Sequence, residues 1–259
     1  MTVGTVDIAC RDVSMVFSSA AGPVRALDGV TLDVERGELI ALIGPSGCGK
    51  STLLRLIADV LQPTDGTIEV RGGAPMRARL AREFGFVFQH PGLLLWRDAL
   101  ANVRLPLEIG GWGKRHVPPH RPEDLLELVG LQGFERAYPR QLSGGMQQRV
   151  SIARALVTGP PILLMDEPFG ALDEITRDHL NQELLRIWAA TGTTIIFVTH
   201  SIPEAVYLSS RIFVFTHRPG RVLEEVRIDL PSPREPSVKD TPEFVRHTGA
   251  LRRALARAG

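Results

Sequence analysis

The chain has 259 residues, and its 30 Lys and Arg residues against 29 Asp and Glu residues give a formal net charge of +1. This balance provides no bulk electrostatic argument for nucleic-acid binding, and no apolar run approaches the roughly 20 residues of a membrane-spanning helix. The N-terminal segment lacks the charged start and long apolar core of a signal peptide, and Cys10 and Cys48 do not form a disulfide framework. The sequence therefore predicts a soluble protein of a reducing compartment.

The first 40 residues have the pattern of β-strands. Alternating apolar residues favour strands at 6–8, 13–17 and 31–34, and Gly22-Pro23 marks a turn between them. Phe17 closes the second of these runs, just before a loop. Taken alone, Phe17 is more typical of a core residue than of an aromatic ring that stacks on a purine.

A glycine-rich turn follows the apolar run 39–43 and precedes the helical pattern 53–57. It matches G-x-x-x-x-G-K-[ST], in which glycines let backbone N–H groups wrap a polyphosphate and the helix start adds partial positive charge. Lys50 offers a compact ammonium to the phosphates, and Ser51 offers a hydroxyl to Mg²⁺. We therefore expect nucleotide phosphates to lie against Gly44, Pro45, Ser46, Gly47, Cys48, Gly49, Lys50, Ser51 and Thr52.

The next segment alternates between strand and helix signals. A turn leads into a predicted strand at 67–70, an arginine-rich stretch favours a solvated helix within 72–83, and 84–88 is typical of a buried strand. Gln89 ends that strand.

Residues 90–158 have mostly helix and loop patterns, including a short amphipathic helix at 124–129. Leu93-Leu94-Leu95-Trp96 form an apolar cluster in a turn-flanked segment, where loops are usually polar. Two alternatives stay open: the cluster is the core of a small helical lobe, or it docks a partner.

A second glycine motif, Leu142-Ser143-Gly144-Gly145-Met146-Gln147-Gln148-Arg149, opens another helical pattern. Ser143 is a suitable N-cap, and Gly144 and Gly145 leave their N–H groups accessible at the helix start. Taken alone, this motif is either a second anion site or an ordinary capped helix with glycines for close packing.

Two carboxylates end the buried strand 162–165, at the position where open α/β sheets bind ligands. Asp166 there can hold Mg²⁺ through its water shell, and Glu167 can orient and deprotonate an attacking water. One acidic residue would more often be a helix cap, but two together favour a functional site. His200 follows the next core strand, 194–198, where a lone histidine is more often structural.

In this order the motifs resemble those of the ATP-binding subunits of ABC transporters, over about residues 6–230. The resemblance implies an α/β fold: a P-loop NTPase (RecA-like) core with an N-terminal antiparallel β subdomain and an α-helical subdomain inserted at about 90–158. It assigns Walker A to 44–52, the Q-loop to Gln89, the signature to 142–149, Walker B with its glutamate to 163–168, the D-loop to 171–173 and the switch histidine to His200.

The resemblance also implies a role for each residue. It gives ATP hydrolysis to Lys50, Gln89, Glu167 and His200, and Mg²⁺ to Ser51, Gln89 and Asp166. It gives ATP contacts to Phe17, residues 44–52, Ser143, Gly144, Gly145, Gln147 and Asp173. Phe17 takes the position of an adenine-stacking aromatic, which reverses its interpretation as a core residue.

The implied partners are a second copy of the chain, head-to-tail around two ATP, and two membrane permease subunits that dock near Gln89 and Leu93–Trp96. An extracytoplasmic solute-binding protein would act indirectly, and the chain would lie on the cytoplasmic face of the plasma membrane. A soluble ABC ATPase not coupled to transport is the alternative, and no nucleic-acid partner is expected.

A narrower resemblance is to the nitrate, taurine and aliphatic-sulfonate importer branch, and it rests in part on 197–200, 204–208 and 218–221. Leu95 stands where that branch usually has proline, and Ser201 stands where it usually has aspartate.

Residues 231–259 differ in composition from the rest. Prolines at 231, 233, 236 and 242 predict an extended linker, and 242–257 predict a basic helix with an apolar side of Phe244, Val245, Leu251 and Leu255. We expect this helix to pack against its own domain, with membrane-surface contact as the alternative.

Overall fold

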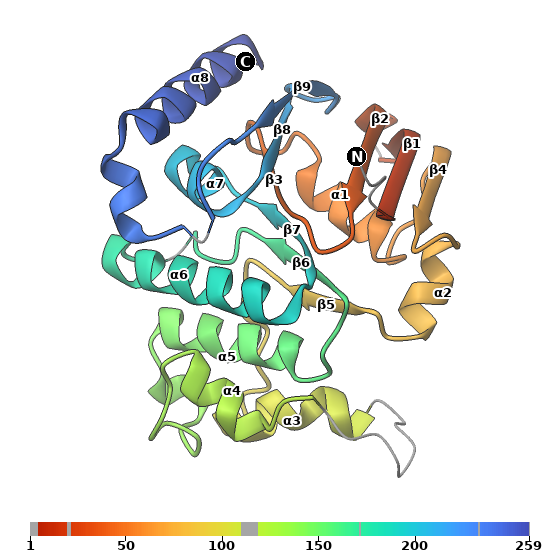
Figure 1. Cartoon of the computed structure of the whole chain (residues 1–259). Coiled ribbons are helices and arrows are strands. Elements are labelled where there is room, and N and C mark those ends of the chain that lie inside the picture. The colour runs from red at the N-terminus through yellow and green to blue at the C-terminus, as the bar shows by residue number, and fades with distance from the viewer. Residues whose placement is uncertain (1–4, 20–21, 110–118, 171, 233, 259) are drawn as a thin grey trace.

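The computed structural model describes residues 5–19, 22–109, 119–170, 172–232 and 234–258 (Figure 1). Residues 110–118 of the predicted helical subdomain, Ala171 of the D-loop and Pro233 of the linker lie outside these residues. No helix in the described part of the chain is both long and apolar enough to span a membrane.

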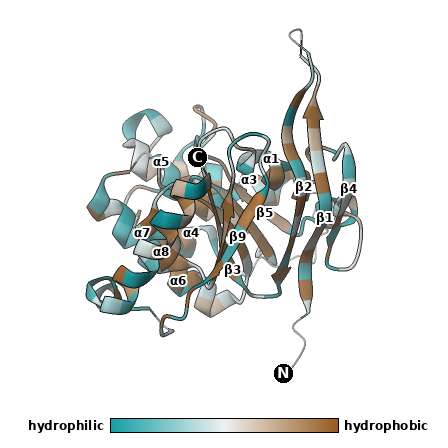
Figure 2. Ribbon diagram, turned by 90° about the horizontal axis from the view of Figure 1, so that it is seen from above, coloured by the Kyte–Doolittle hydropathy of each residue, from teal (hydrophilic) through white to brown (hydrophobic). Residues whose placement is uncertain are grey.

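A small antiparallel sheet, with the order β2-β1-β4, is built from β1 (Val6–Phe17), β2 (Val24–Glu35) and β4 (Asp65–Val70). The sequence predicted shorter strands here, and these bounds were wrong. Register shifts along β1, one of them between Cys10 and Val13, bend the strand and break the simple alternation of side chains while the pairing continues. The resulting hairpin projects from the body of the molecule in Figure 2.

The second sheet has six strands in the order β5-β6-β7-β3-β8-β9. Its first five strands are parallel, and β9 pairs antiparallel at the edge. Their bounds are β5 Phe84–Val87, β6 Ile162–Asp166, β7 Thr194–Val198, β3 Leu39–Ile43, β8 Arg211–Phe215 and β9 Val222–Arg227. Because the parallel strands run the same way, all their carboxyl ends lie at one edge of the sheet.

Neither β8 nor β9 was predicted from the sequence, and the predicted end of β5 was one residue too far. The side chains of β9 are only partly covered. Phe88 lies beyond β5 and is 45% exposed, stacked on Phe86 with a centroid separation of 4.3 Å. The helix expected within 72–83 is only the six-residue α2 (Pro75–Leu80), because Gly73 pairs with Val70 and the helix starts after that pair.

Both faces of the large sheet are buried. In β3, Leu39, Ala41 and Ile43 belong to one hydrophobic cluster, while Ile40 and Leu42 belong to the other. This explains the continuous apolar run of β3, which is typical of a parallel strand with helices on both sides. Figure 2 shows the hydrophobic strands at the centre and hydrophilic residues on the outer helices.

The helices divide into groups around the sheet (Figure 1). Helices α3, α4 and α5 lie together at the lower end, α1 and α2 lie near the small sheet, and α6, α7 and α8 lie on the opposite side. Their bounds are α1 Lys50–Ile57, α2 Pro75–Leu80, α3 Ala99–Ile109, α4 Pro122–Leu128, α5 Gly144–Leu156, α6 Glu174–Thr191, α7 Ile202–Leu208 and α8 Pro242–Ala258. Short 3₁₀ turns span Pro139–Gln141 and Pro236–Asp240.

The C-terminal helix α8 packs against its own domain, as expected, in contact with α7, β8 and β9. Phe244 and Leu251 are buried in this contact, and Leu255 packs against the same cluster. Val245 does not follow the predicted apolar side, since it is 62% exposed.

Candidate functional site

The predicted site residues gather at the edge of the large sheet where the parallel strands end. The loop 44–49 follows β3, Gln89 lies two residues beyond β5, Glu167 follows β6 and His200 lies two residues beyond β7. Sequence-distant motifs therefore meet because the strands that carry them are hydrogen-bonded neighbours.

Glycines are required in the loop by close backbone approach. A Cβ at Gly44 would lie 2.8 Å from the carbonyl oxygen of Phe215, and a Cβ at Gly49 would lie 2.6 Å from Cδ2 of Leu27. Gly49 is also the N-cap of α1, with a φ of 105° that disfavours any other residue. The free N–H groups at the start of α1 can therefore reach an anion without side chains in the way.

Lys50 is 5% exposed, and its ammonium is held inside the loop. Its Nζ donates to the carbonyl oxygens of Gly44 at 2.8 Å and Pro45 at 3.0 Å, and lies 3.5 Å from the buried Cys48 Sγ. The positive charge is thus positioned by the same backbone that would surround a phosphate chain.

Ser51 and Asp166 form a pair of oxygen ligands. The Ser51 hydroxyl donates to Asp166 Oδ1 at 2.7 Å, and Asp166 is 6% exposed. Burial raises the pKa of Asp166, the Ser51 hydrogen bond opposes that shift, and the nearby Glu167 charge adds to it. A buried carboxylate beside a hydroxyl, both hard oxygen donors, fits Mg²⁺.

Two polar side chains converge on one carboxylate oxygen of Glu167. Gln89 donates through Nε2 to Glu167 Oε2 at 3.1 Å, and His200 Nδ1 lies 3.4 Å from the same oxygen.

The backbone of Glu167 has an unusual conformation. Its N–H donates to the carbonyl oxygen of Val198 at 3.0 Å, and its φ is 47°. Such left-handed backbone is costly for a glutamate and is concentrated at functional sites. The His200 side chain is 61% exposed, which is unlike a structural core histidine.

Glu204, four residues after His200, is a buried carboxyl that was not predicted as a site residue. The Thr199 hydroxyl donates to Glu204, and the Ser201 N–H donates back to Thr199 Oγ1 at 2.9 Å. Burial raises the pKa of Glu204. Ser201 caps α7 by accepting from the Glu204 N–H at 3.4 Å, so it fills a capping position that an aspartate could also fill.

The phosphate loop, Gln89 and Glu167 line a pocket of about 440 Å³, whereas Asp166 and His200 are not among its described lining residues. Phe17, which is 37% exposed, is part of its wall, so the ring is accessible and not a core residue. The lining residues are Phe17, Val24, Ala26, Ser46, Gly47, Gly49, Lys50, Ser51, Thr52, Gln89, Glu167 and Arg218.

Arg218 was missed as a site residue, since 218–221 was used only as a mark of the narrower importer branch. Its guanidinium donates to the Gly47 carbonyl from Nε at 3.3 Å and from Nη2 at 3.4 Å. The apolar run 212–215 could have indicated Arg218, because that run belongs to β8, another strand that ends at this edge of the sheet. With Lys50, it gives the pocket a second cation.

The signature and the D-loop do not join this pocket. Ser143 caps α5 by accepting from the Met146 N–H at 3.3 Å, and Asp173 caps α6 by accepting from the Thr176 N–H at 2.9 Å. No residue of either motif is among the described residues that line the pocket. Ser143 and Gly144 are exposed, so their helix start is available to another molecule.

Gly145 and Gln147 have structural contacts within the chain. A Cβ at Gly145 would lie 2.9 Å from Cδ2 of Leu172, and the Gln147 amide donates to the carbonyls of Pro139 at 3.0 Å and Leu142 at 3.2 Å. These contacts fix the start of α5, and the ATP contacts of Gly145 and Gln147 stay predictions.

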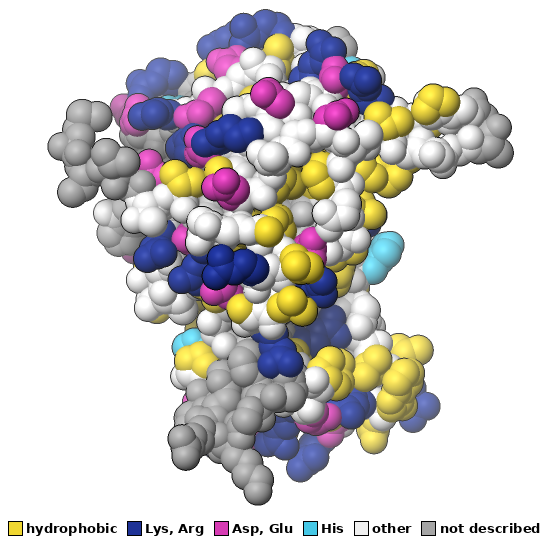
Figure 3. Space-filling view, turned by 90° about the vertical axis from the view of Figure 1, so that its right-hand side faces the viewer, with side chains coloured by type: hydrophobic (Ala, Val, Ile, Leu, Met, Phe, Trp, Pro, Cys, Tyr) yellow, Lys and Arg dark blue, Asp and Glu magenta, His cyan; other side chains and the backbone are white. Residues whose placement is uncertain are grey.

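The apolar cluster 93–96 divides between the two alternatives. Leu93 packs against the hydrophobic core, and Leu94 is half-buried with its N–H bonded to Asn102 Oδ1 at 2.8 Å. Leu95 and Trp96 are 70% and 73% exposed. Figure 3 shows hydrophobic side chains gathered at the lower right of this face, at the end of the molecule that carries α3 to α5.

Comparison with known proteins identifies the family. The model of the ABC transporter family matches residues 27–170, more than half of the chain. The chain belongs to the ABC transporter ATP-binding family. An uncharacterized ABC transporter ATP-binding protein of Methanocaldococcus jannaschii is 47% identical over 239 residues, which cover 89% of this chain and 85% of that protein. The aliphatic sulfonates import ATP-binding protein SsuB of Bacillus cereus is 42% identical over 227 residues, or 88% of each chain.

Solved ABC cassettes share the fold. The dimeric structure of a bacterial ABC transporter cassette covers 86% of this chain with a TM-score of 0.76 and 34% identity. A dimeric post-hydrolysis state of an ATP-binding cassette, bound to ADP and Pi, has the same TM-score at 33% identity. The predicted ABC ATPase fold is confirmed, and the chain is an ATP-binding subunit of a family that hydrolyses ATP.

Proposed function

We propose that this ABC ATP-binding subunit drives solute import, with Glu167 as the general base for ATP hydrolysis. The observation that carries the catalytic assignment is the convergence of Gln89 and His200 on one oxygen of Glu167, beside the Ser51–Asp166 pair. Among the described residues no hydrogen bond is made to the other oxygen, Oε1, which would accept a proton from water.

In this proposal the loop 44–52 holds the β- and γ-phosphates of ATP through its N–H groups and the Lys50 ammonium. Glu167 orients and deprotonates the attacking water, and His200 contacts the γ-phosphate from the end of β7. Mg²⁺, when bound, would neutralise charge on the phosphates, held by Ser51, Asp166 and the amide oxygen of Gln89. Most of the rate acceleration then comes from charges positioned before the reaction begins.

The second half of the site comes from another copy of the chain. The exposed helix start at Ser143 and Gly144 lies outside the pocket of its own chain, although it has free N–H groups suited to a phosphate. In a head-to-tail dimer this motif of each chain would face the ATP of the other, so two ATP would be enclosed at a two-fold interface. The similar cassettes are described as dimers, which supports this arrangement.

Two permease subunits would dock beside Gln89. Leu95 and Trp96 offer exposed apolar surface, and an apolar groove of about 410 Å³ lies near them along the chain, with Phe86, Phe88 and Ile109 in its lining. A partner helix seated there would press on the segment that carries Gln89, and thereby on Glu167. We place residues 6–230 in the cassette, its helical subdomain at about 90–158, and residues 231–259 in an extension.

The transported solute we propose is a small anion such as an alkanesulfonate, taurine or nitrate. The support is the 42% identity to a sulfonate importer subunit together with the branch motifs at 197–200 and 218–221. Uptake assays on a strain that lacks this gene test the proposal directly. Loss of uptake of one of these anions, restored by the wild-type gene and not by Glu167→Gln, is expected. Unchanged uptake of all three, with ATPase activity intact, would favour an ABC ATPase that serves another process.

Replacing Phe17 by Ala should weaken ATP binding by about 1–3 kcal/mol, the magnitude seen for stacking of a base on an aromatic side chain. GTP affinity should fall similarly, because stacking reads the face of the base and not its hydrogen-bonding edge. Calorimetric titration with both nucleotides measures the effect. An unchanged affinity with a lower melting temperature would make Phe17 a packing residue.

Replacing Arg218 by Gln should weaken ATP binding about tenfold, the typical worth of a hydrogen bond to a charged group. Adenosine binding should change little, because the lost guanidinium lies at the phosphate loop. Arg221→Gln is the matched control, since Arg221 pairs with Asp28 and does not line the pocket. Equal ATP affinities for the two variants would contradict a contact between Arg218 and the phosphates of ATP.

A further inference from the structure

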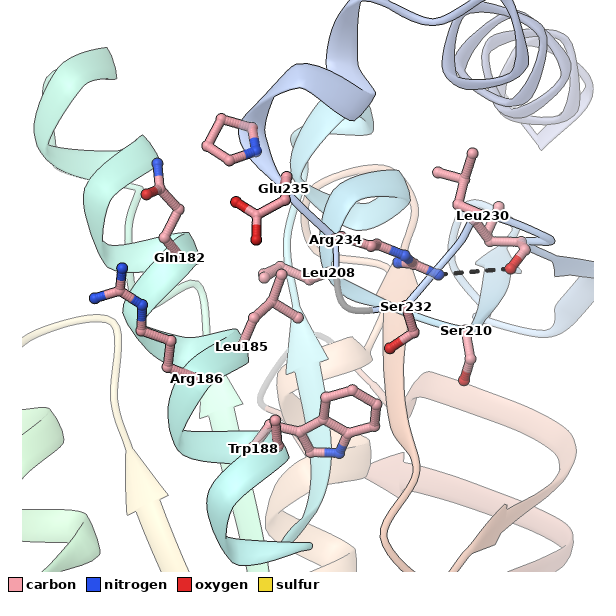
Figure 4. A pocket seen from close by; sticks show the side chains of 13 residues that line it. Gln182, Leu185, Arg186, Trp188, Leu208, Ser210, Leu230, Ser232, Arg234 and Glu235 are labelled. Carbon is pink, nitrogen blue, oxygen red and sulfur yellow. Dashed lines mark hydrogen bonds between the residues drawn. The ribbon is translucent and has the colours of Figure 1, made fainter.

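Another cavity is lined by different residues from those of the nucleotide pocket. It has a volume of about 290 Å³ and lies between α6, the end of α7 and the residues 228–232 and 234–236 that precede α8. Figure 4 shows the side chains of Gln182, Leu185 and Trp188 directed from α6 toward Leu208 and that segment. The nucleotide-site residues do not line it.

The walls of this cavity are mostly apolar. Leu185 and Trp188 come from α6, Leu208 ends α7, and Ile228 and Leu230 follow the end of β9. The Trp188 indole is fixed, because its Nε1 donates to the Gly37 carbonyl at 2.8 Å. A fixed aromatic ring beside branched aliphatic side chains suits the apolar body of a small ligand.

Arg234 places a guanidinium in this apolar setting. Its Nη1 donates to the carbonyls of Val206 at 3.1 Å, Tyr207 at 3.0 Å and Ser209 at 2.9 Å, so it caps the end of α7. Its Nη2 donates to the carbonyl of Ile228 at 3.5 Å. Among the described residues Arg234 has no ion pair with a carboxylate, and burial lowers the pKa of Arg234 to about 10. A half-buried cation that is balanced by carbonyl dipoles favours a nearby anion.

The other charged groups that line the cavity do not reverse this preference. Arg186 is at its edge and pairs with Glu183, while Glu235 is exposed at the opposite rim. Because Glu183 offsets Arg186, the remaining charges of the lining are Arg234 and the solvent-exposed Glu235 at the rim. The Ser210 hydroxyl is already bonded to Glu38 and Leu39, so Ser232 is the hydroxyl that a ligand could use.

We propose that this cavity is an effector site for a small amphipathic anion, with its apolar body against Trp188 and its acidic group near Arg234. This inference is independent of the nucleotide-site assignments and adds a ligand to the chain. An aromatic or short aliphatic acid fits both the size and the charge of the site.

The cavity is joined to the nucleotide site by the two helices that line it. The N-cap of α6 is Asp173 in the D-loop, and the N-cap of α7, Ser201, directly follows His200. The C-terminal segment contacts both helices. Lys239 forms an ion pair with Asp178 of α6 at 2.6 Å, and its ammonium lies over the ring of Tyr207 of α7. A ligand that holds α6, α7 and this segment together would therefore change ATP turnover.

The test is calorimetric titration of the full chain, kept saturated with ADP, with benzenesulfonate and with its neutral near-isostere benzenesulfonamide. ADP keeps the sulfonate out of the nucleotide pocket. Saturable sulfonate binding at about 1 mM or tighter, with the sulfonamide about tenfold weaker, is expected. No saturation by about 10 mM, or equal binding of the two compounds, would overturn the proposal.

A matched pair of variants locates the binding. Ala189 lines the cavity and its exposed neighbour Ala190 does not, so Ala189→Phe should weaken sulfonate binding about tenfold while Ala190→Phe leaves it unchanged. Melting curves verify that both variants fold. Steady-state ATPase assays should show at least about a twofold change with benzenesulfonate in wild type and none in Ala189→Phe. Equal binding by both variants, or binding without a change in turnover, would contradict the effector site.

Discussion

Replacing Glu167 by Gln should reduce ATP hydrolysis by about 10²–10⁴-fold, the usual contribution of a general base. The amide keeps the size of the carboxylate and can still bond to Gln89, but it cannot take a proton from water. Affinity for Mg-ATP should remain close to wild type, because Lys50 and the loop around it are unchanged. Phosphate release measured at saturating ATP gives the rate, and calorimetry gives the affinity.

The control for this variant is Asp166→Asn, which alters the neighbouring carboxylate. It should lower the affinity for Mg²⁺, since Asp166 and not Glu167 bonds to Ser51. Turnover of Glu167→Gln near the wild-type rate would remove Glu167 from its role as the base.

The double change Leu95→Asp and Trp96→Asp should abolish solute uptake and the stimulation of ATPase activity by membrane subunits. Both side chains are at least 70% exposed, so new charges there should change stability by no more than about 0.5 kcal/mol and leave basal hydrolysis near wild type. Leu94 is left intact, because it is half-buried and bonded to Asn102. Melting curves, basal ATPase and uptake in a reconstituted complex are the measurements.

Val245→Asp serves as the matched control, since Val245 is 62% exposed on α8, far along the chain from Gln89. It should leave both basal activity and uptake unchanged. Uptake that persists with both aspartates at 95 and 96 would rule out docking there. Loss of basal ATPase together with a lower melting temperature would show that the two residues stabilise the fold.

The sequence was informative where chemistry requires particular residues at fixed spacing. The loop 44–52, the Asp166-Glu167 pair and His200 each follow a strand, and a parallel sheet necessarily brings strand ends to one edge. Their meeting could therefore be predicted from the sequence. The contact of Gln89 with Glu167 was harder to predict from the sequence, because it also depends on β5 lying beside β6.

The sequence was less informative where tertiary packing decides the outcome. The long hairpin of β1 and β2 contains bulges that disturb alternation, so its length could not be counted from apolar periodicity. Leu93 and Trp96 are both large apolar residues of one sequence cluster, yet Leu93 packs against the core and Trp96 is exposed. Arg218 shares the pocket only because its loop folds over Gly47, a contact that no local motif encodes.

ATP binding should join two copies of this chain, with the Ser143 motif of each copy completing the site of the other. Sedimentation velocity of Glu167→Gln with Mg-ATP tests this arrangement, because the variant should bind ATP without consuming it. We expect a monomer with ADP and a dimer with Mg-ATP. Adding Ser143→Arg to the same chain should keep it monomeric while ATP still binds. A Glu167→Gln chain that remains monomeric when saturated with Mg-ATP would contradict the proposed dimer.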